Sequence, residues 1–82
     1  MRRYISIIFR PNVSSAEADE CLKKDGLEID WICKGEESGE DHGIGVVTVE
    51  AESERAFNEL IGNIQKADIV DKAHEPPYRK RI

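Results

Sequence analysis

Short runs of alternating apolar and polar residues recur four times along this chain, and two stretches with helical spacing separate them. The alternating runs cover residues 3–9, 27–34, 44–51 and 69–74. Runs 3–9 and 44–51 carry apolar residues on both sides, many of them β-branched, which indicates strands in the middle of a sheet. Run 27–34 alternates strictly, which indicates a half-buried strand near an edge. The pattern therefore predicts a four-stranded sheet.

The two intervening stretches begin with residues that cap helices. Ser14 is followed three positions later by Glu17, which makes a capping box, and Gly26 is placed to end this helix in a left-handed conformation. Ser53 is expected to cap the second helix, with Glu54 in its first turn. The apolar stripe of this helix consists of Ala56, Phe57, Leu60, Ile61 and Ile64. Both stretches are therefore predicted to be amphipathic helices that pack on the sheet.

The element order β-α-β-β-α-β is that of the split βαβ, or ferredoxin-like, arrangement. We therefore predict an α+β fold with an antiparallel sheet in the order 4-1-3-2 and both helices on one face. This order places strands 1 and 3 in the middle, which agrees with their apolar character on both sides.

The predicted topology leaves the second face of the sheet without a covering layer. Apolar residues expected on it are Tyr4, Ile8, Ile32, Ile44 and Val46. A continuous apolar patch of this kind typically marks an interaction surface, whereas scattered surface apolar residues need no partner. We expect self-association as a homodimer, through this face or by joining sheet edges.

The formal net charge of −5 conceals an uneven distribution. Residues 11–75 hold all 17 acidic residues and six of the 12 basic ones, and the remaining six basic residues lie near the two ends. An acidic body argues against a broad nucleic-acid surface, and Tyr4 is the one exposed aromatic residue expected on the sheet. The strand order is expected to bring together at one corner Arg2, Arg3, Arg79, Lys80 and Arg81. This corner is either a contact for phosphate or an acidic partner, or part of a solvated tail.

Residues that could support catalysis or metal binding do not form a recognisable set. Cys21 and Cys33 lack CxxC spacing and are expected to be free thiols, and His42 and His74 are far apart in sequence. Gly43-Ile44-Gly45 enters a strand rather than opening a helix, so it does not match a phosphate loop. We expect no enzyme activity, no metal and no cofactor.

No apolar run approaches the roughly 20 residues that a bilayer-spanning helix requires. The apolar start of the chain ends at Arg10-Pro11 without a signal-peptide cleavage site. We therefore expect a cytoplasmic protein without a membrane partner.

The turn Arg10-Pro11-Asn12-Val13 follows an apolar strand and precedes a helix, and a later strand reads Gly45-Val46-Val47-Thr48-Val49. Together with Ala67-Asp68-Ile69-Val70 before the last strand, these segments resemble the ACT domain, a regulatory ligand-binding module of amino-acid metabolism. The resemblance covers about residues 4–74. It implies one ACT-like domain over residues 1–75, followed by a basic tail, 76–82.

The resemblance implies a regulatory or sensor domain that binds a small metabolite, possibly an amino acid, as a homodimer. It assigns the ligand contacts to Asn12, Val13 and Ser14. Asn12 stands where the family turn has glycine, and asparagine tolerates the positive φ that such a turn needs. Its side chain occupies space that a ligand would use. The alternative is a ligand-free module that docks a partner protein through the open sheet face.

Overall fold

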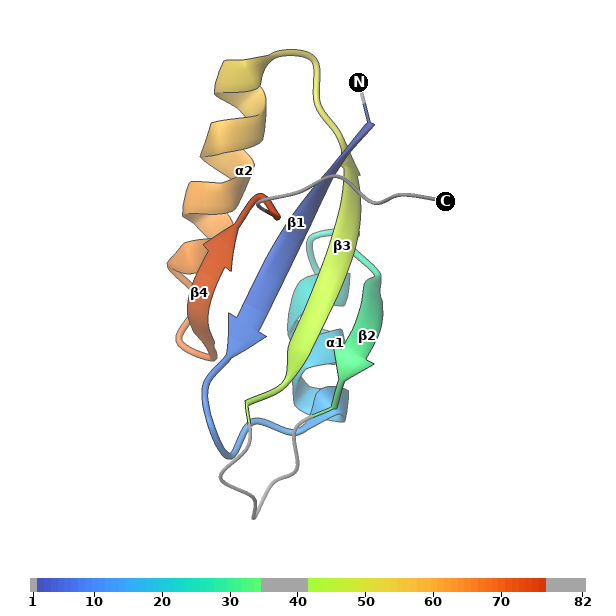
Figure 1. Cartoon of the computed structure of the whole chain (residues 1–82), viewed down its shortest axis with the longest axis vertical. Helices are drawn as coiled ribbons and strands as arrows, with labels where there is room; N and C mark the ends of the chain where they lie inside the picture. Colours follow the sequence, from blue (N-terminus) through green and yellow to red (C-terminus); the bar gives the residue numbers. More distant parts are fainter. Residues whose placement is uncertain (1, 35–41, 77–82) are drawn as a thin grey trace.

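A computed structural model describes residues 2–34 and 42–76 of the chain. Its six elements are β1 (Arg2–Phe9), α1 (Ser15–Lys23), β2 (Ile29–Cys33), β3 (Ile44–Glu50), α2 (Glu54–Gln65) and β4 (Val70–His74). The strands form one antiparallel sheet in the order β2-β3-β1-β4, and both helices lie behind it in Figure 1. The predicted α+β, ferredoxin-like fold is confirmed, including the strand order.

The hydrophobic core lies between the sheet and the helices. Alternate residues of β1 face the helices, and Ile5, Ile7 and Phe9 are completely buried there. The helices contribute buried side chains, among them Leu22 of α1 and Phe57 of α2. This face of the sheet is buried because both amphipathic helices turn their apolar stripes toward it.

The predicted helix signals act as expected. The Ser14 hydroxyl accepts a hydrogen bond from the Glu17 backbone N–H at 3.1 Å, and the Ser53 hydroxyl accepts one from Ala56 at the same distance. Gly26 has a φ of 76°, so α1 ends in the predicted left-handed residue. These local signals fix where each helix begins and where the first one turns back to the sheet.

Three strands are shorter than their alternating runs, β3 by the single residue that follows Glu50. The run from residue 27 becomes regular only at Ile29, because the Leu27 backbone N–H donates to the Leu22 carbonyl at 3.1 Å and belongs to the turn that ends α1. The last strand begins at Val70 rather than at 69. Residues 35–41 between β2 and β3 lie outside the described residues, as do residues 77–82 of the predicted basic tail.

Close approach of β2 to β3 depends on Gly45, which is buried and lies opposite Ile7 on β1 and Trp31 on β2. A Cβ atom at this position would collide with the Ile29 side chain. The glycine therefore makes room for the edge strand and lets Trp31 pack inward, with 5.3 Å between its ring centroid and that of Phe9.

Candidate docking face and neighbouring sites

Neither α1 nor α2 covers the second face of the sheet, and on this uncovered face residues lie opposite one another in rows across the strands. One row runs from β4 to β2 through His74, Ser6, Val46 and Asp30. The next row runs in the same direction through Lys72, Ile8, Ile44 and Cys33. Toward the start of β1, Tyr4 lies opposite Thr48 and Arg2 lies opposite Glu50. The strand register thus defines a face with an apolar centre.

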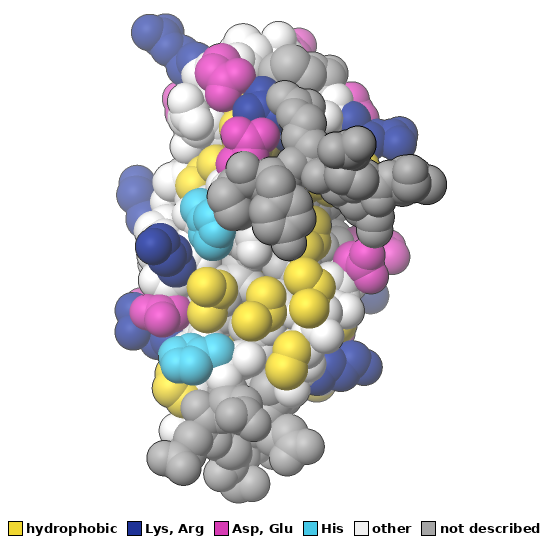
Figure 2. Space-filling view, in the orientation of Figure 1, with side chains coloured by type: hydrophobic (Ala, Val, Ile, Leu, Met, Phe, Trp, Pro, Cys, Tyr) yellow, Lys and Arg dark blue, Asp and Glu magenta, His cyan; other side chains and the backbone are white. Residues whose placement is uncertain are grey.

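We call the apolar centre the open-face patch, which consists of Tyr4, Ile8, Ile32, Ile44 and Val46. The strand register and the alternation along β2 place all five on the uncovered face, as the sequence predicts. Tyr4 is 45% exposed and Ile32 is 68% exposed, and the other three are half-buried. Figure 2 shows hydrophobic side chains gathered over the strands on this face. Their role as an interface stays a prediction.

The two edges of this face carry opposite charges. Lys72 lies on the β4 edge, and Asp30 lies on the β2 edge. Both side chains are exposed, and neither has an ion-pair partner within residues 2–34 and 42–76. In these two rows, the β4 edge thus carries Lys72, which we call the basic β4 margin, and the β2 edge carries Asp30, which we call the acidic β2 margin.

His74 lies on the β4 edge in the same row as Asp30. Its Nδ1 atom is buried and has no hydrogen-bond partner in the described part of the chain. A buried polar atom without a hydrogen-bond partner lowers the stability of the fold by roughly 1–3 kcal/mol. His74 is therefore a locally unfavourable position on the β4 edge.

The three residues that the ACT resemblance assigns to a ligand lie together in the turn after β1. Asn12 is exposed with a φ of 71°, as expected for the glycine position of that turn. Val13 packs against the core, and the Ser14 hydroxyl is engaged at the start of α1. Arg10 fixes the turn to the segment before β4, since its Nε donates to the Asp68 carbonyl at 2.7 Å. Asn12 is thus the member of the three that is exposed to solvent.

A cluster at the opposite end of β1 was not predicted from the sequence. The Arg3 guanidinium bonds Glu54 at 2.9 Å and Glu75 at 2.8 Å. The hydrogen bonds that Arg3 donates, to Glu54 first and then to Glu75, raise the pKa of Arg3, and Arg3 in turn lowers the pKa of Glu54. Arg3 shares its side of β1 with Ile5, and this parity is the sequence signal that could have placed it beneath the helices.

These contacts bear on the basic corner that the sequence predicts from Arg2, Arg3, Arg79, Lys80 and Arg81. Arg3 is held by two carboxylates, and Arg2 lies 3.4 Å from Glu50. Arg79, Lys80 and Arg81 lie outside the described residues. The described half of the corner is therefore charge-balanced rather than a free basic patch.

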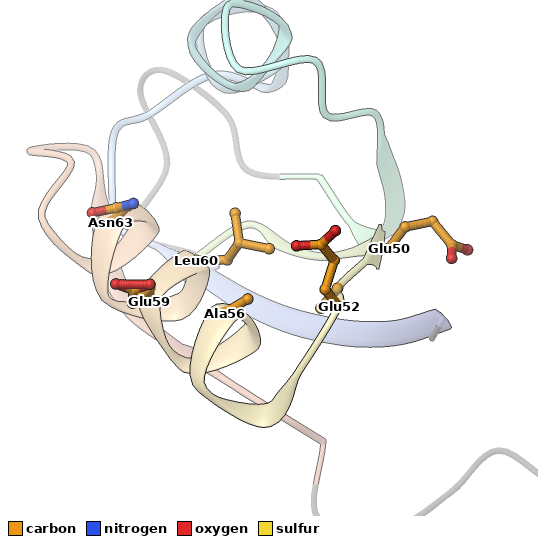
Figure 3. A pocket seen from close by; sticks show the side chains of 7 residues that line it. Glu50, Glu52, Ala56, Glu59, Leu60 and Asn63 are labelled. Carbon is orange, nitrogen blue, oxygen red and sulfur yellow. The ribbon is translucent and has the colours of Figure 1, made fainter.

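A shallow groove of about 440 Å³ runs along α2 beside the end of β3. Figure 3 shows the Glu52 carboxylate turned toward Leu60, whereas the Glu50 side chain points away from the groove. Ala56, Glu59 and Asn63 complete its wall. The groove is open, and three of its lining residues are glutamates.

The residues considered for catalysis or metal binding lie apart from one another. Cys21 and Cys33 are free thiols, and His42 Nδ1 lies 2.8 Å from the Phe9 carbonyl oxygen. Within residues 2–34 and 42–76, no group of three His, Cys, Asp or Glu side chains could hold a metal ion. Neither α1 nor α2 has the length and apolar character needed to cross a bilayer.

Comparisons with protein-family models, with curated proteins and with solved structures gave no significant match. The ACT resemblance therefore remains a prediction from the sequence.

Proposed function

We propose that this chain is a small association domain that works as a homodimer, with its two copies meeting through the uncovered sheet faces. The observation that carries the proposal is the open-face patch, five apolar side chains in the middle of a face that no helix covers. Removing such a patch from water favours association by about 25 cal/mol per Å² of apolar surface.

Chain size supports the same proposal. A domain of 82 residues buries a smaller fraction of its surface than a larger one, and its free energy of unfolding is correspondingly modest. A second copy on the uncovered face would turn two layers of structure into four and bury the sheet on both sides. Association would then stabilise the folded state by mass action.

Substitution of Val46 with lysine tests the proposal. The side chain is half-buried in the centre of the patch, so a charge there opposes burial in the dimer while the helix-facing core is untouched. We expect light scattering to give a dimer mass for the unmodified chain and a monomer mass for Val46→Lys, with the same circular dichroism.

The matched control is Asn58→Lys, which adds the same charge at an exposed position of α2. This variant should remain a dimer. The proposal fails if the unmodified chain is monomeric at millimolar concentration, or if Val46→Lys folds and keeps the dimer mass.

A second candidate function is metabolite sensing by an ACT-like domain, with Asn12, Val13 and Ser14 as the contacts. The positive φ of Asn12 favours it, because the turn has the backbone conformation that the family's glycine adopts. A thermal-shift screen against the amino acids tests this function. A ligand would raise the melting temperature, and its effect should change in Asn12→Gly. A folded dimer whose melting temperature no amino acid raises would argue against it.

A further inference from the structure

We propose that the two copies stack with their two-fold axis parallel to the strands, so that the basic β4 margin of each lies over the acidic β2 margin of the other. Lys72 and Asp30 are then the residues that set the orientation of the pair. This inference rests on the proposed homodimer and specifies how its two faces recognise each other.

The positions of the charged residues on a single face support this orientation of the two copies. Lys72 and Asp30 lie on opposite edge strands, with Ile8, Ile44 and Val46 between them. By contrast, Arg2 and Arg3 already have glutamate partners within the chain. Lys72 and Asp30 are thus left to pair with groups outside the described chain. In Figure 2, charged side chains border the hydrophobic centre on both sides.

Two symmetric ways of stacking aligned sheets face to face are possible. A two-fold axis across the strands places β4 over the partner's β4, so that both Lys72 residues lie on one edge of the pair and both Asp30 residues lie on the other. An axis along the strands reverses the strand order, so that β4 of each copy lies over β2 of the other. Like charges repel and opposite charges attract, so the charge pattern selects the second arrangement.

The positions of Lys72 and Asp30 along their strands also allow Lys72 to pair with Asp30 of the second copy. Asp30 shares a row with His74, and Lys72 lies one row further along β4. Rows on one face are separated by about 7 Å, the rise of two strand residues. The flexible four-carbon stem of a lysine can span such an offset. Lys72 can therefore reach the partner's Asp30 without any shift of the stacked sheets.

The area of the face indicates how strongly the charge contacts should affect the affinity of the dimer. The strands β1, β2, β3 and β4 have 8, 5, 7 and 5 residues, so at about 3.3 Å per residue and about 4.8 Å between strands the face covers roughly 400 Å² per copy. Stable interfaces usually bury about 800 Å² per partner, so we expect a weak, dissociable dimer. In a weak dimer, the symmetric pair of charge contacts has a visible effect on affinity.

Charge reversal on the full chain tests the orientation. In the proposed arrangement, Asp30→Lys faces the partner's Lys72, and Lys72→Glu faces the partner's Asp30, so each single variant should dimerise about tenfold or more weakly. The double variant Asp30→Lys/Lys72→Glu restores opposite charges and should recover the unmodified Kd. Sedimentation equilibrium at low salt measures all four proteins.

Matched controls are Glu20→Lys and Lys23→Glu, the same charge changes at exposed positions of α1 on the covered side of the sheet. Neither should alter the Kd by more than about twofold, because exposed charges away from an interface are screened. Circular dichroism of each variant establishes that it is folded.

The outcomes separate this inference from the proposed function. Weakened single variants with a recovered double variant support the stacking along the strands. If the unmodified chain dimerises and Val46→Lys is monomeric, but all charge variants keep the same Kd, the homodimer stands and its orientation is overturned. If the unmodified chain remains a monomer, both fail. Single variants that weaken without recovery in the double variant also overturn the pairing of Lys72 with Asp30.

Discussion

The guanidinium of Arg3 lies over the ring of Phe57, with 4.1 Å between Cζ and the ring centroid. The same group bonds the carboxylates of Glu54 and Glu75, so it joins the start of β1, the first turn of α2 and the residue after β4. The Arg3 side chain is only 17% exposed, which makes these contacts less screened by water than those of a surface ion pair. One charged residue thus closes the end of the core where three elements meet.

Replacing Arg3 with methionine should destabilise the fold more than the same change at Arg2. Arg3→Met loses two ion pairs and the contact with the Phe57 ring, whereas the Arg2–Glu50 pair is about 70% exposed on both sides. We expect the melting temperature, followed by the fluorescence of Trp31, to fall by several degrees for Arg3→Met and hardly at all for Arg2→Met. Equal losses in both variants would show that Arg3 acts as an ordinary surface residue.

The ion pair of Arg3 also predicts a pH dependence of stability. A hydrogen bond from Arg3, with its positive charge, lowers the pKa of Glu54 below its usual 4.5. Because this pKa is lower in the folded state, the pair stabilises the fold above pH 4.5 and the effect disappears as the pH falls through the lowered pKa. The stability difference between the unmodified chain and Glu54→Gln should therefore shrink as the pH falls below 4.5.

Urea denaturation at each pH measures that difference, and Glu59→Gln on the same helix is the control. Glu59 has no ion pair among the described residues, so its variant should follow the unmodified chain across this range. A constant difference for Glu54→Gln from neutral to acidic pH would contradict the prediction.

Two glycine-to-alanine substitutions should act in opposite directions. Gly45→Ala places a Cβ against the Ile29 side chain in the buried contact between β2 and β3, and overpacking of this kind costs about 1–3 kcal/mol. Gly62→Ala adds a Cβ in open space on α2 and should stabilise the fold by up to about 1 kcal/mol. Urea denaturation of both variants checks the prediction, and Gly45→Ala with unchanged stability would refute the close strand contact.

The turn after β1 provides a test of backbone conformation at Asn12. A φ of 71° is strained for alanine and unstrained for glycine, so Asn12→Ala should be less stable than Asn12→Gly by about 1 kcal/mol. Chemical denaturation of the two variants measures the difference. Equal stabilities would mean that the turn rearranges when the asparagine is removed.

Much of this fold follows from short-range rules that the sequence displays directly. Ser14, Ser53 and Gly26 determine helix ends through their own backbone neighbours, and the alternation through Ile5 and Ile7 determines which side of β1 is buried. The uncovered face could be predicted for the same reason, because strand order and alternation together fix the positions of Tyr4, Ile8 and Val46.

What the sequence did not reveal depends on contacts between distant residues. Arg3 and Glu75 are 72 positions apart, and only the register of β1 with β4 brings them together. The strict alternation of residues 27–34 also suggested a longer strand, because Leu27 has the right polarity for the sheet while its N–H completes the turn after α1. An alternating pattern predicts which side chains are buried. It does not predict which group the backbone N–H of a residue will bond.

The ion pair between Arg3 and Glu75 joins side chains from the two ends of the six-element unit, and these ends lie on the neighbouring strands β1 and β4, where Ser6 is paired with His74. A short linker could therefore join these positions, and new termini could be opened at an exposed turn such as the one near Gly26. For the same reason, the unit could be spliced into a surface loop of a host protein while leaving the host's chain path almost unchanged. The ion pair at this corner thus makes the domain suitable for circular permutation and for use as an insert.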